Sequence, residues 1–278
     1  MITLGSVAAV SGIIFAAAVL QRAVGFGFAL LAVPLLAFVV PTKSAVVIVF
    51  LNGTVVCAWL ATRLRRHTEW PMARRLGVGA IAGAPVGVII LSVTSAATLR
   101  LVLGVTTCMA ADWIIVSSRL ARPEPVVPHR STTLAMGFAS GVINTSLATN
   151  GPPLVYELRR AGFHGDRFRA TISAVFLLSN LIGLPLLALA GLITTFDIVL
   201  AVASVLPCAA GIIVGSWMGG RMGPSHFGWD SRRSPLGHRP TDHLQSNLVK
   251  LVVSWLEQSA GAQSWSAPSV LSRRFLQK

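Results

Sequence analysis

The sequence predicts an all-α fold, a polytopic transmembrane helical bundle built from two inverted-topology repeats with broken or re-entrant helices. Three observations predict it. Hydrophobic residue types make up 54% of the 278 residues and charged types only 12%, where a soluble domain carries roughly a quarter charged. The apolar residues form runs of about 18 to 22, the length that crosses a hydrocarbon layer of roughly 30 Å. The two halves of the chain also resemble each other.

Eight segments have the length and composition of membrane spans. They are residues 3–21, 24–40, 44–62, 76–93, 98–117, 131–149, 169–190 and 196–220. The first run is followed directly by a second and has no small-residue cleavage site, so we interpret it as a span and not as a removed signal. The expected organisation is a first repeat over 1–117, a linker over 118–130, a second repeat over 131–222 and a polar tail over 223–278 that is disordered or frameshifted.

The positive charges lie between the apolar runs. The formal net charge is +14, and the strongly basic loops are 63–75, 118–130 and 157–169. Cytoplasmic loops carry such an excess of Lys and Arg, so all three loops are predicted to be cytoplasmic. No basic face interleaved with aromatic residues is present on which bases would stack, so nucleic acid is not an expected partner.

An internal repeat appears when the chain is shifted by 128 residues. Asn52 then meets Asn180, and Ala82-Gly83-x-x-Val86-Gly87 meets Ala210-Gly211-x-x-Val214-Gly215. With a two-residue gap, Gly25 meets Gly151. Loop 63–75 is basic while its counterpart, 191–195, carries no charge, so matching loops lie on opposite sides of the membrane. Inverted repeats of this kind are typical of secondary transporters, whose substrate site lies near the midplane between the halves.

Each half contains a candidate helix break. At Asn150-Gly151-Pro152-Pro153 the prolines remove backbone donors and disfavour the preceding α conformation, which in lipid is tolerated only beside protein or a polar cavity. One interpretation is a substrate site at half-helix ends, whose N–H groups and dipole attract an anion; the other is a loop at the membrane face. Gly25-Phe26-Gly27-Phe28 is the counterpart, although Gly-x-Gly also occurs in ordinary packed membrane helices and 24–40 is long enough for a complete helix.

Four polar residues within the spans have two interpretations each. If the first two segments form a re-entrant hairpin, Arg22 lies deep in the membrane, where it would bind an oxyanion. If they are two full spans, Arg22 is an ordinary basic residue at the cytoplasmic side. Asn52 and Asn180 form hydrogen bonds with a substrate oxygen or with each other in one interpretation. In the other, each forms a hydrogen bond that only holds neighbouring helices together. Asp112 is the one carboxylate well within a predicted span, where it either couples protons or, beside Trp113, lies at the interface.

No motif for cofactor chemistry was found. The six His are scattered, and Cys57, Cys108 and Cys208 lie inside apolar runs without metal spacing, so we expect small buried hydrophobes there. Neither a cofactor nor a metal is expected. A membrane-embedded enzyme would need catalytic polar groups converging at one depth, and the sequence shows none.

At these residues the chain resembles the sulfite exporter TauE/SafE family of bacterial permeases. The resemblance rests on Gln21-x-x-x-Gly25-Phe26-Gly27-Phe28 followed by Pro34, on Gly151-Pro152-Pro153-Leu154 and on the repeated Ala-Gly-x-x-Val-Gly. It implies a multi-pass secondary transporter of the bacterial inner membrane. Its partners would be the lipid bilayer and a small anion such as sulfite, a sulfonate or a related organic anion, with a homo-oligomer left open. The candidate substrate-binding residues are Gln21, Arg22, Gly25, Phe26, Gly27, Asn52, Asn150, Gly151, Pro152, Pro153 and Asn180.

One departure from the family pattern concerns the C-terminus. The span 98–117 should recur near 226–245, where the sequence instead begins His-Phe-Gly-Trp-Asp. The alternatives to a working permease are therefore an inactive truncated family member, or a non-transporting membrane assembly or sensor subunit.

Overall fold

The computed structural model describes residues 4–24, 27–119, 128–149 and 151–221. Within these ranges the regular structure is entirely helical. The helices are α1 (Leu4–Val24), α2 (Phe28–Leu36), α3 (Thr42–Arg63), the short 3-10 helix η1 (Arg65–His67), α4 (Trp70–Val93), α5 (Ala96–Arg119), α6 (Arg130–Leu147), α7 (Gly151–Arg160), α8 (Gly165–Leu189), α9 (Thr195–Ala203) and α10 (Val205–Arg221). Most of the predicted linker and the whole predicted tail lie outside the described residues.

Five segments of the described chain are long and apolar enough to cross a membrane. They are Leu4–Arg22, Thr42–Arg63, Trp70–Val93, Gly165–Leu189 and Thr195–Trp217. The predicted span 24–40 is wrong, because α2 has 9 residues and covers only roughly 14 Å at 1.5 Å per residue. The predicted span 196–220 is divided at Ser204 into α9 and α10. Pro207 lies in the first turn of α10, where it lacks the N–H that would bond to the Ala203 carbonyl and so disfavours a continuous α-helix.

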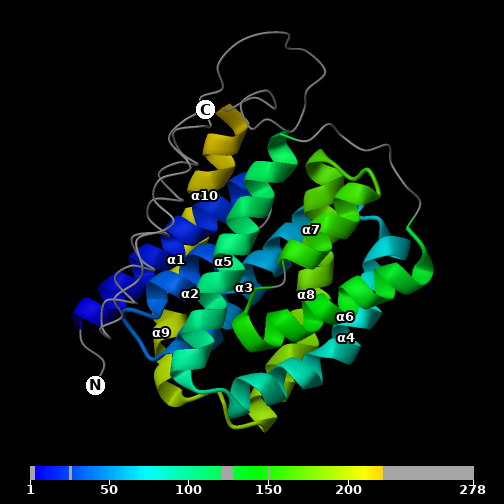
Figure 1. The fold of residues 1–278 in the computed structure, drawn as a ribbon. Helices are drawn as coiled ribbons and strands as arrows, with labels where there is room; N and C mark the ends of the chain where they lie inside the picture. Colours follow the sequence, from blue (N-terminus) through cyan, green and yellow to red (C-terminus); the bar gives the residue numbers. More distant parts are fainter. Residues whose placement is uncertain (1–3, 25–26, 120–127, 150, 222–278) are drawn as a thin grey trace, which may run out of the picture.

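The long helices pack in matching pairs around the central helices α3 and α8. α4 packs along α6 and α1 packs along α10 (Figure 1). A Cβ atom added to Gly83 or Gly87 would lie less than 3.0 Å from the backbone oxygen of Phe138 or Val142, respectively. In the other pair, a Cβ atom added to Gly211 or Gly215 would also lie less than 3.0 Å from a backbone oxygen, that of Phe15 or Val19, respectively. These glycines of the repeated Ala-Gly-x-x-Val-Gly motif, which we call the glycine stripes of α4 and α10, are therefore surfaces of close helix packing in both halves.

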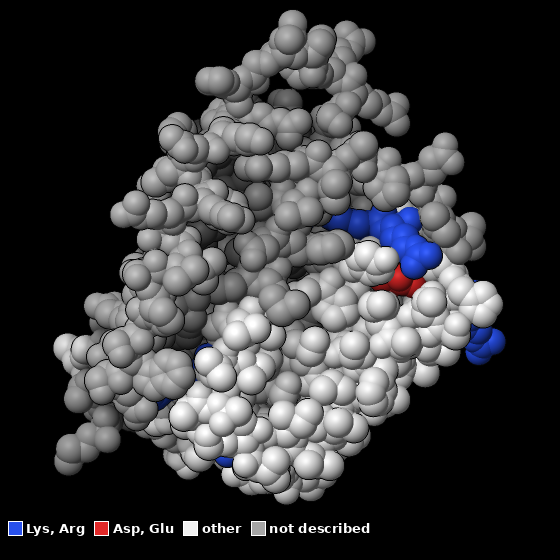
Figure 2. All heavy atoms as spheres, in the orientation of Figure 1, with Lys and Arg blue, Asp and Glu red and all other residues white. Residues whose placement is uncertain are grey.

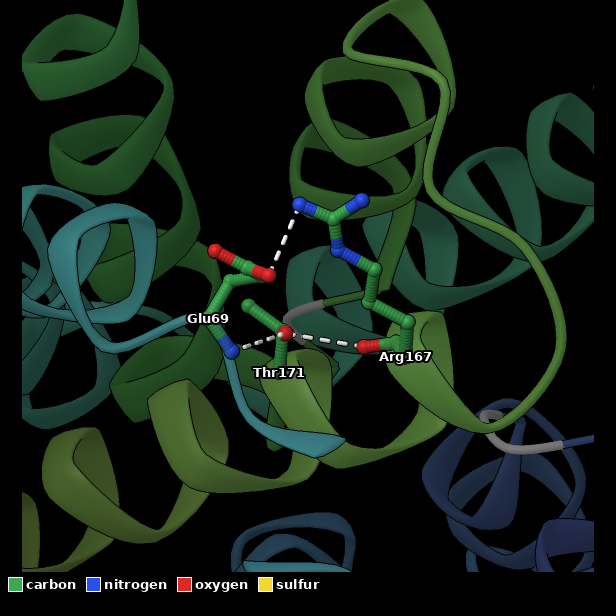
Figure 3. Close-up of polar contacts among 3 residues, drawn as sticks. All are labelled: Glu69, Arg167 and Thr171. Carbon is green, nitrogen blue, oxygen red and sulfur yellow. Dashed lines mark hydrogen bonds and ion pairs between the residues drawn. The ribbon is translucent and has the colours of Figure 1, made fainter. Parts of the chain in front are cut away.

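One end of the bundle holds two of the basic loops. Arg167 at the start of α8 forms an ion pair with Glu69, with Nη2 and Oε1 2.7 Å apart, and the Glu69 backbone N–H donates to the Thr171 hydroxyl at 3.1 Å (Figure 3). The connection from α3 to α4 and the start of α8 are thus side by side. On the face drawn in Figure 2, most of the visible Lys and Arg atoms gather at one edge, next to acidic atoms and above a broad uncharged surface. This adjacency agrees with the prediction that the two loops share one side of the membrane.

Different contacts join the helices at the opposite end. The Lys43 ammonium donates to the Ser92 carbonyl oxygen at 2.9 Å, and Arg100 Nε donates to the Thr42 hydroxyl at 2.9 Å. The start of α3, the end of α4 and the start of α5 therefore meet there. α3 and α4 run the full distance between the two ends.

A hairpin is formed by α6 and α7. The Thr133 hydroxyl, in the first turn of α6, donates to Glu157 Oε1, near the end of α7, at 2.8 Å. The chain therefore enters the bundle along α6 and returns along α7 toward the end where α6 began. In the first half, α1 and α2 are joined by the bond from the Phe28 backbone N–H to Gln21 Oε1, at 3.0 Å.

Candidate functional site

A cavity lies at the point where the two helix breaks meet. Its volume is about 40 Å³, and a water molecule needs roughly 10–15 Å³ measured in this way, so it has room for a few water-sized groups. Both halves of the chain contribute to it. The lining residues are Gln21, Gly27, Phe28, Ala29, Leu30, Val49, Phe50, Gly53, Val56, Cys57, Asn144, Ala148, Thr149, Gly151, Phe176 and Asn180. We call this the central cavity.

The first break places the start of α2 at the central cavity. Gly27 precedes α2 with φ 103°, a left-handed conformation that glycine adopts without the steric cost of a Cβ atom. Phe28 is the first residue of α2, and its backbone N–H is bound by the Gln21 side chain. Gln21 is 2% exposed. One of the N–H groups that a helix start leaves unpaired is thus satisfied inside the bundle.

The second break has a different local structure. α6 ends at Leu147, and the C-cap residue Ala148 is the one non-glycine residue with positive φ, 55°, among those described. Gly151 is the first residue of α7, so Pro152 and Pro153 lie within its first turn. Proline is tolerated there because that N–H has no intrahelical acceptor. The two prolines therefore remove two of the N–H donors that the start of α7 would otherwise present to an anion.

An asparagine pair forms one wall of the central cavity. Asn144 Nδ2 on α6 donates to Asn180 Oδ1 on α8 and to the Ser179 hydroxyl, both at 2.9 Å. Asn180 Nδ2 donates to the Thr54 hydroxyl on α3 at 3.0 Å. Asn144 and Asn180 are 2% and 5% exposed. This network joins three helices across the two halves and presents amide groups to the cavity.

Asn52, the predicted partner of Asn180, lies elsewhere. Its Nδ2 donates to the Ile48 carbonyl and to the Ser204 hydroxyl, each at 3.1 Å, and it is not among the lining residues of the central cavity. The two asparagines do not bond to each other. Asn52 joins α3 to the α9–α10 break, which is the structural interpretation of the sequence pattern.

Arg22 also points away from the central cavity. Its Nε donates to the Ser216 hydroxyl on α10 at 3.0 Å, and its guanidinium carbon lies 5.9 Å from the centre of the Trp59 ring. Arg63 lies at a similar distance, 5.8 Å, from the same ring. Arg22 is therefore at the end of α3 that continues into the basic loop 63–75.

Comparison with known families agrees with the resemblance. The sequence model of the family described as sulfite exporter TauE/SafE matches residues 10–229. The chain belongs to this family. No curated protein and no solved structure gives a match. A transporter family and five apolar helical segments together make the chain an integral membrane protein.

The structure of this TauE/SafE chain unites part of the predicted site. Gln21, Gly27, Gly151 and Asn180 line the central cavity. Pro152 and Pro153 directly follow Gly151 in the first turn of α7. Gly25, Phe26 and Asn150 lie outside the described residues, as do the side chains of Asp112, Trp113 and Cys108. The described residues include no cluster of three metal-ligating side chains.

Sequence reasoning missed several residues of this TauE/SafE chain. Asn144 is the most important of them, and its signal was the polar run Asn144-Thr145-Ser146 inside a predicted span. Thr149 and Phe176 also line the cavity. Glu157 was overlooked because it falls in a basic loop, yet it is fully buried. Thr133 binds its Oε1, while its Oε2 has no hydrogen-bond partner among the described residues.

Proposed function

We propose that this TauE/SafE protein is a secondary transporter of the bacterial inner membrane that moves a small anion, such as sulfite, a sulfonate or a related organic anion, through the central cavity. The observation that carries the proposal is the meeting of both helix breaks at one polar cavity. Irregular backbone within a membrane is tolerated where it is covered by protein or lines such a cavity, and transporters build their substrate sites from broken helices.

The lining of the central cavity suits a weakly held anion. It contains amide and hydroxyl groups from Gln21, Asn144, Thr149 and Asn180 and no Lys, Arg, Asp or Glu among the described residues. The starts of α2 and α7 add the positive ends of two helix dipoles. A transported ion must bind well enough to enter and weakly enough to leave. Dipoles and neutral donors meet that requirement better than a fixed guanidinium would.

We infer that the two halves are inverted repeats. Three helix boundaries support this inference because each recurs after the same offset of 123 residues: the end of α1 at 24 and of α6 at 147, the start of α2 at 28 and of α7 at 151, and the start of α3 at 42 and of α8 at 165. The glycine contacts of α4 with α6 and of α10 with α1 recur in the same way. By these boundaries Gly151 corresponds to Phe28, three residues beyond the Gly25 of the sequence alignment.

The same inference makes both hairpins re-entrant, from opposite sides. The bond between Thr133 and Glu157 supports an α6–α7 hairpin that starts and ends on the side of the basic loops. α2 leads to Thr42 and Lys43 at the opposite end. Rocking of one repeat against the other would then expose the central cavity to each side in turn.

A matched pair of asparagine variants tests the proposal. Uptake of radiolabelled sulfite into proteoliposomes should fall at least about tenfold in Asn180→Ala, since a buried donor to a charged ligand is lost. Asn52→Ala removes an equally buried asparagine outside the central cavity, and its uptake per inserted protein should stay within about twofold of the wild type. Equal losses in both variants would move the pathway elsewhere. Absence of flux in the wild type with sulfite and with organic sulfonates would favour the non-transporting alternative.

A further inference from the structure

A second, larger cavity lies between α1, α3 and α10. Its volume is about 440 Å³, in the range of roughly 300–1,000 Å³ that is typical of small-molecule pockets. It is lined by Arg22, Trp59, Leu60, Arg63, Leu64, Ile213 and Ser216. None of these residues lines the central cavity. We call it the arginine pocket.

The arginine pocket contains two arginines that form no ion pair among the described residues, although Asp166 interacts with Arg22 electrostatically from a longer distance. Arg22 and Arg63 lie at similar distances, 5.9 and 5.8 Å, from the Trp59 ring. The ion pairs found among the described residues involve Glu69 with Arg167 and Asp166 with Arg169, so neither pocket arginine has one in that part of the chain. Arg22 uses Nε to bind Ser216, which fixes the direction of its guanidinium. Two guanidiniums that line one pocket, one of them held by a hydrogen bond, can together bind an oxyanion.

The remaining wall of the arginine pocket is apolar and continues onto the outside of the bundle. Leu60 and Leu64 belong to α3, and Ile213 on α10 is 66% exposed. Trp217, one turn further along α10, is 59% exposed. Exposed apolar side chains on a membrane helix meet acyl chains, and tryptophan is enriched at the level of the lipid headgroups.

We propose that the arginine pocket binds the phosphate of an anionic phospholipid, with an acyl chain lying along Leu64 and Ile213. Basic pockets between transmembrane helices on the cytoplasmic side favour such headgroups, and Arg63 belongs to a loop with the charge pattern of that side. A free oxyanion would use the two guanidiniums but leave the apolar wall without a ligand. The proposal is independent of transport, because it concerns neither the central cavity nor flux.

Lipid titration followed by native mass spectrometry tests this site. The full-length protein, purified in detergent, is titrated with phosphatidylglycerol, and the variant Arg22→Gln/Arg63→Gln should bind the tightest lipid about tenfold more weakly or worse, since its charge-assisted hydrogen bonds are lost. The matched control Arg65→Gln/Arg66→Gln removes two exposed charges of the adjacent 3-10 helix η1. Its affinity should stay within about twofold of the wild type, because exposed charges contribute little to a specific site in detergent.

Three further measurements decide the interpretation. Arg63→Gln alone, at the exposed end of α3, should have a lipid affinity between those of the wild type and the double variant. This single variant replaces the double variant in the comparison if the double variant does not fold. Phosphatidylcholine should bind more weakly than phosphatidylglycerol, and millimolar inorganic phosphate should not displace the lipid. Equal losses in the pocket and control variants, or equal affinity for both lipids, would overturn the proposal. Displacement by inorganic phosphate would also overturn it, in favour of a site for free anions.

Discussion

The two helix breaks at the central cavity solve one physical problem by different means. A helix that starts inside a membrane protein has N–H groups without acceptors, and each is costly if left unpaired. In the first break the Gln21 side chain binds the Phe28 N–H. In the second, Pro152 and Pro153 occupy the first turn of α7, so two of those N–H groups do not exist.

This difference shows that similar helix geometry does not require similar residues. The first break depends on one long side chain, which also lines the cavity. The second depends on proline, and its polar lining comes from Asn144 on the preceding helix. The first break should therefore be sensitive to side-chain chemistry, and the second to backbone conformation. Four substitutions test that contrast.

The largest effect is expected at Gly27. Gly27→Val forces a β-branched residue to adopt φ 103°, and the stability should fall by about 2–3 kcal/mol. Reversible unfolding in mixed micelles measures it. Gly12→Val is the control, because an added Cβ at Gly12 has no neighbour within 4 Å; it should cost less than about 1 kcal/mol. Equal costs would show that the left-handed conformation is not what requires glycine.

A smaller loss is expected from Gln21→Leu. This variant leaves the Phe28 N–H without its acceptor, at a cost of about 1–3 kcal/mol in the same unfolding assay. Gln21→Glu keeps an acceptor oxygen at the same position and should retain more of the stability. If the leucine variant were as stable as the wild type, the capping bond would have no role in the first break.

A gain is expected from Ala148→Gly in the second break. Ala148 has φ 55°, and relieving this left-handed conformation is worth about 1–2 kcal/mol, from which the entropy of glycine subtracts roughly 0.5–1 kcal/mol. The net stabilisation should be a few tenths to about 1 kcal/mol. Ala190, at the end of α8, has φ −76°, so Ala190→Gly should give no gain. If Ala148→Gly lowered the stability, the claim that the second break is sensitive to backbone conformation would be wrong.

The smallest stability effect is expected from Pro153→Ala. The first turn of α7 accepts either residue, so stability should stay within about 1 kcal/mol of the wild type. The new N–H adds a donor at the cavity end of α7, and the KM for sulfite uptake should fall severalfold if the anion binds there. An unchanged KM would place the ion away from α7.

Some features of the site followed from the sequence because they depend on local chemistry. Gly-x-Gly permits a sharp change of backbone direction and Gly-Pro-Pro is compatible with a helix start, and so Gly27 and Gly151 were predicted as parts of breaks. Asn144 and Glu157 were missed for a different reason. Whether a polar side chain lines a cavity, binds a neighbour or faces lipid depends on helix rotation and on partners far away in the chain.

The pairing of Asn52 with Asn180 shows that limit clearly. The shift of 128 residues matches the glycine stripes of α4 and α10, whereas the helix boundaries near the breaks recur at 123. A single shift cannot describe both regions, and part of the difference comes from the helices between them, because α3 has 22 residues and α8 has 25. Asn180 consequently lies at the central cavity while Asn52 bonds to Ser204.

Composition and periodicity alone determined that this protein is helical and membrane-embedded, because burial in lipid imposes length, polarity and backbone rules that every residue must obey. They also predicted two repeats with a helix break in each. The family also followed from short motifs. The tertiary structure was needed to bring Gln21, Asn144 and Asn180 to one cavity and to direct Arg22 to another. Those outcomes depend on close helix approach at glycine and on the direction of each side chain, which arise from packing between residues more than a hundred positions apart.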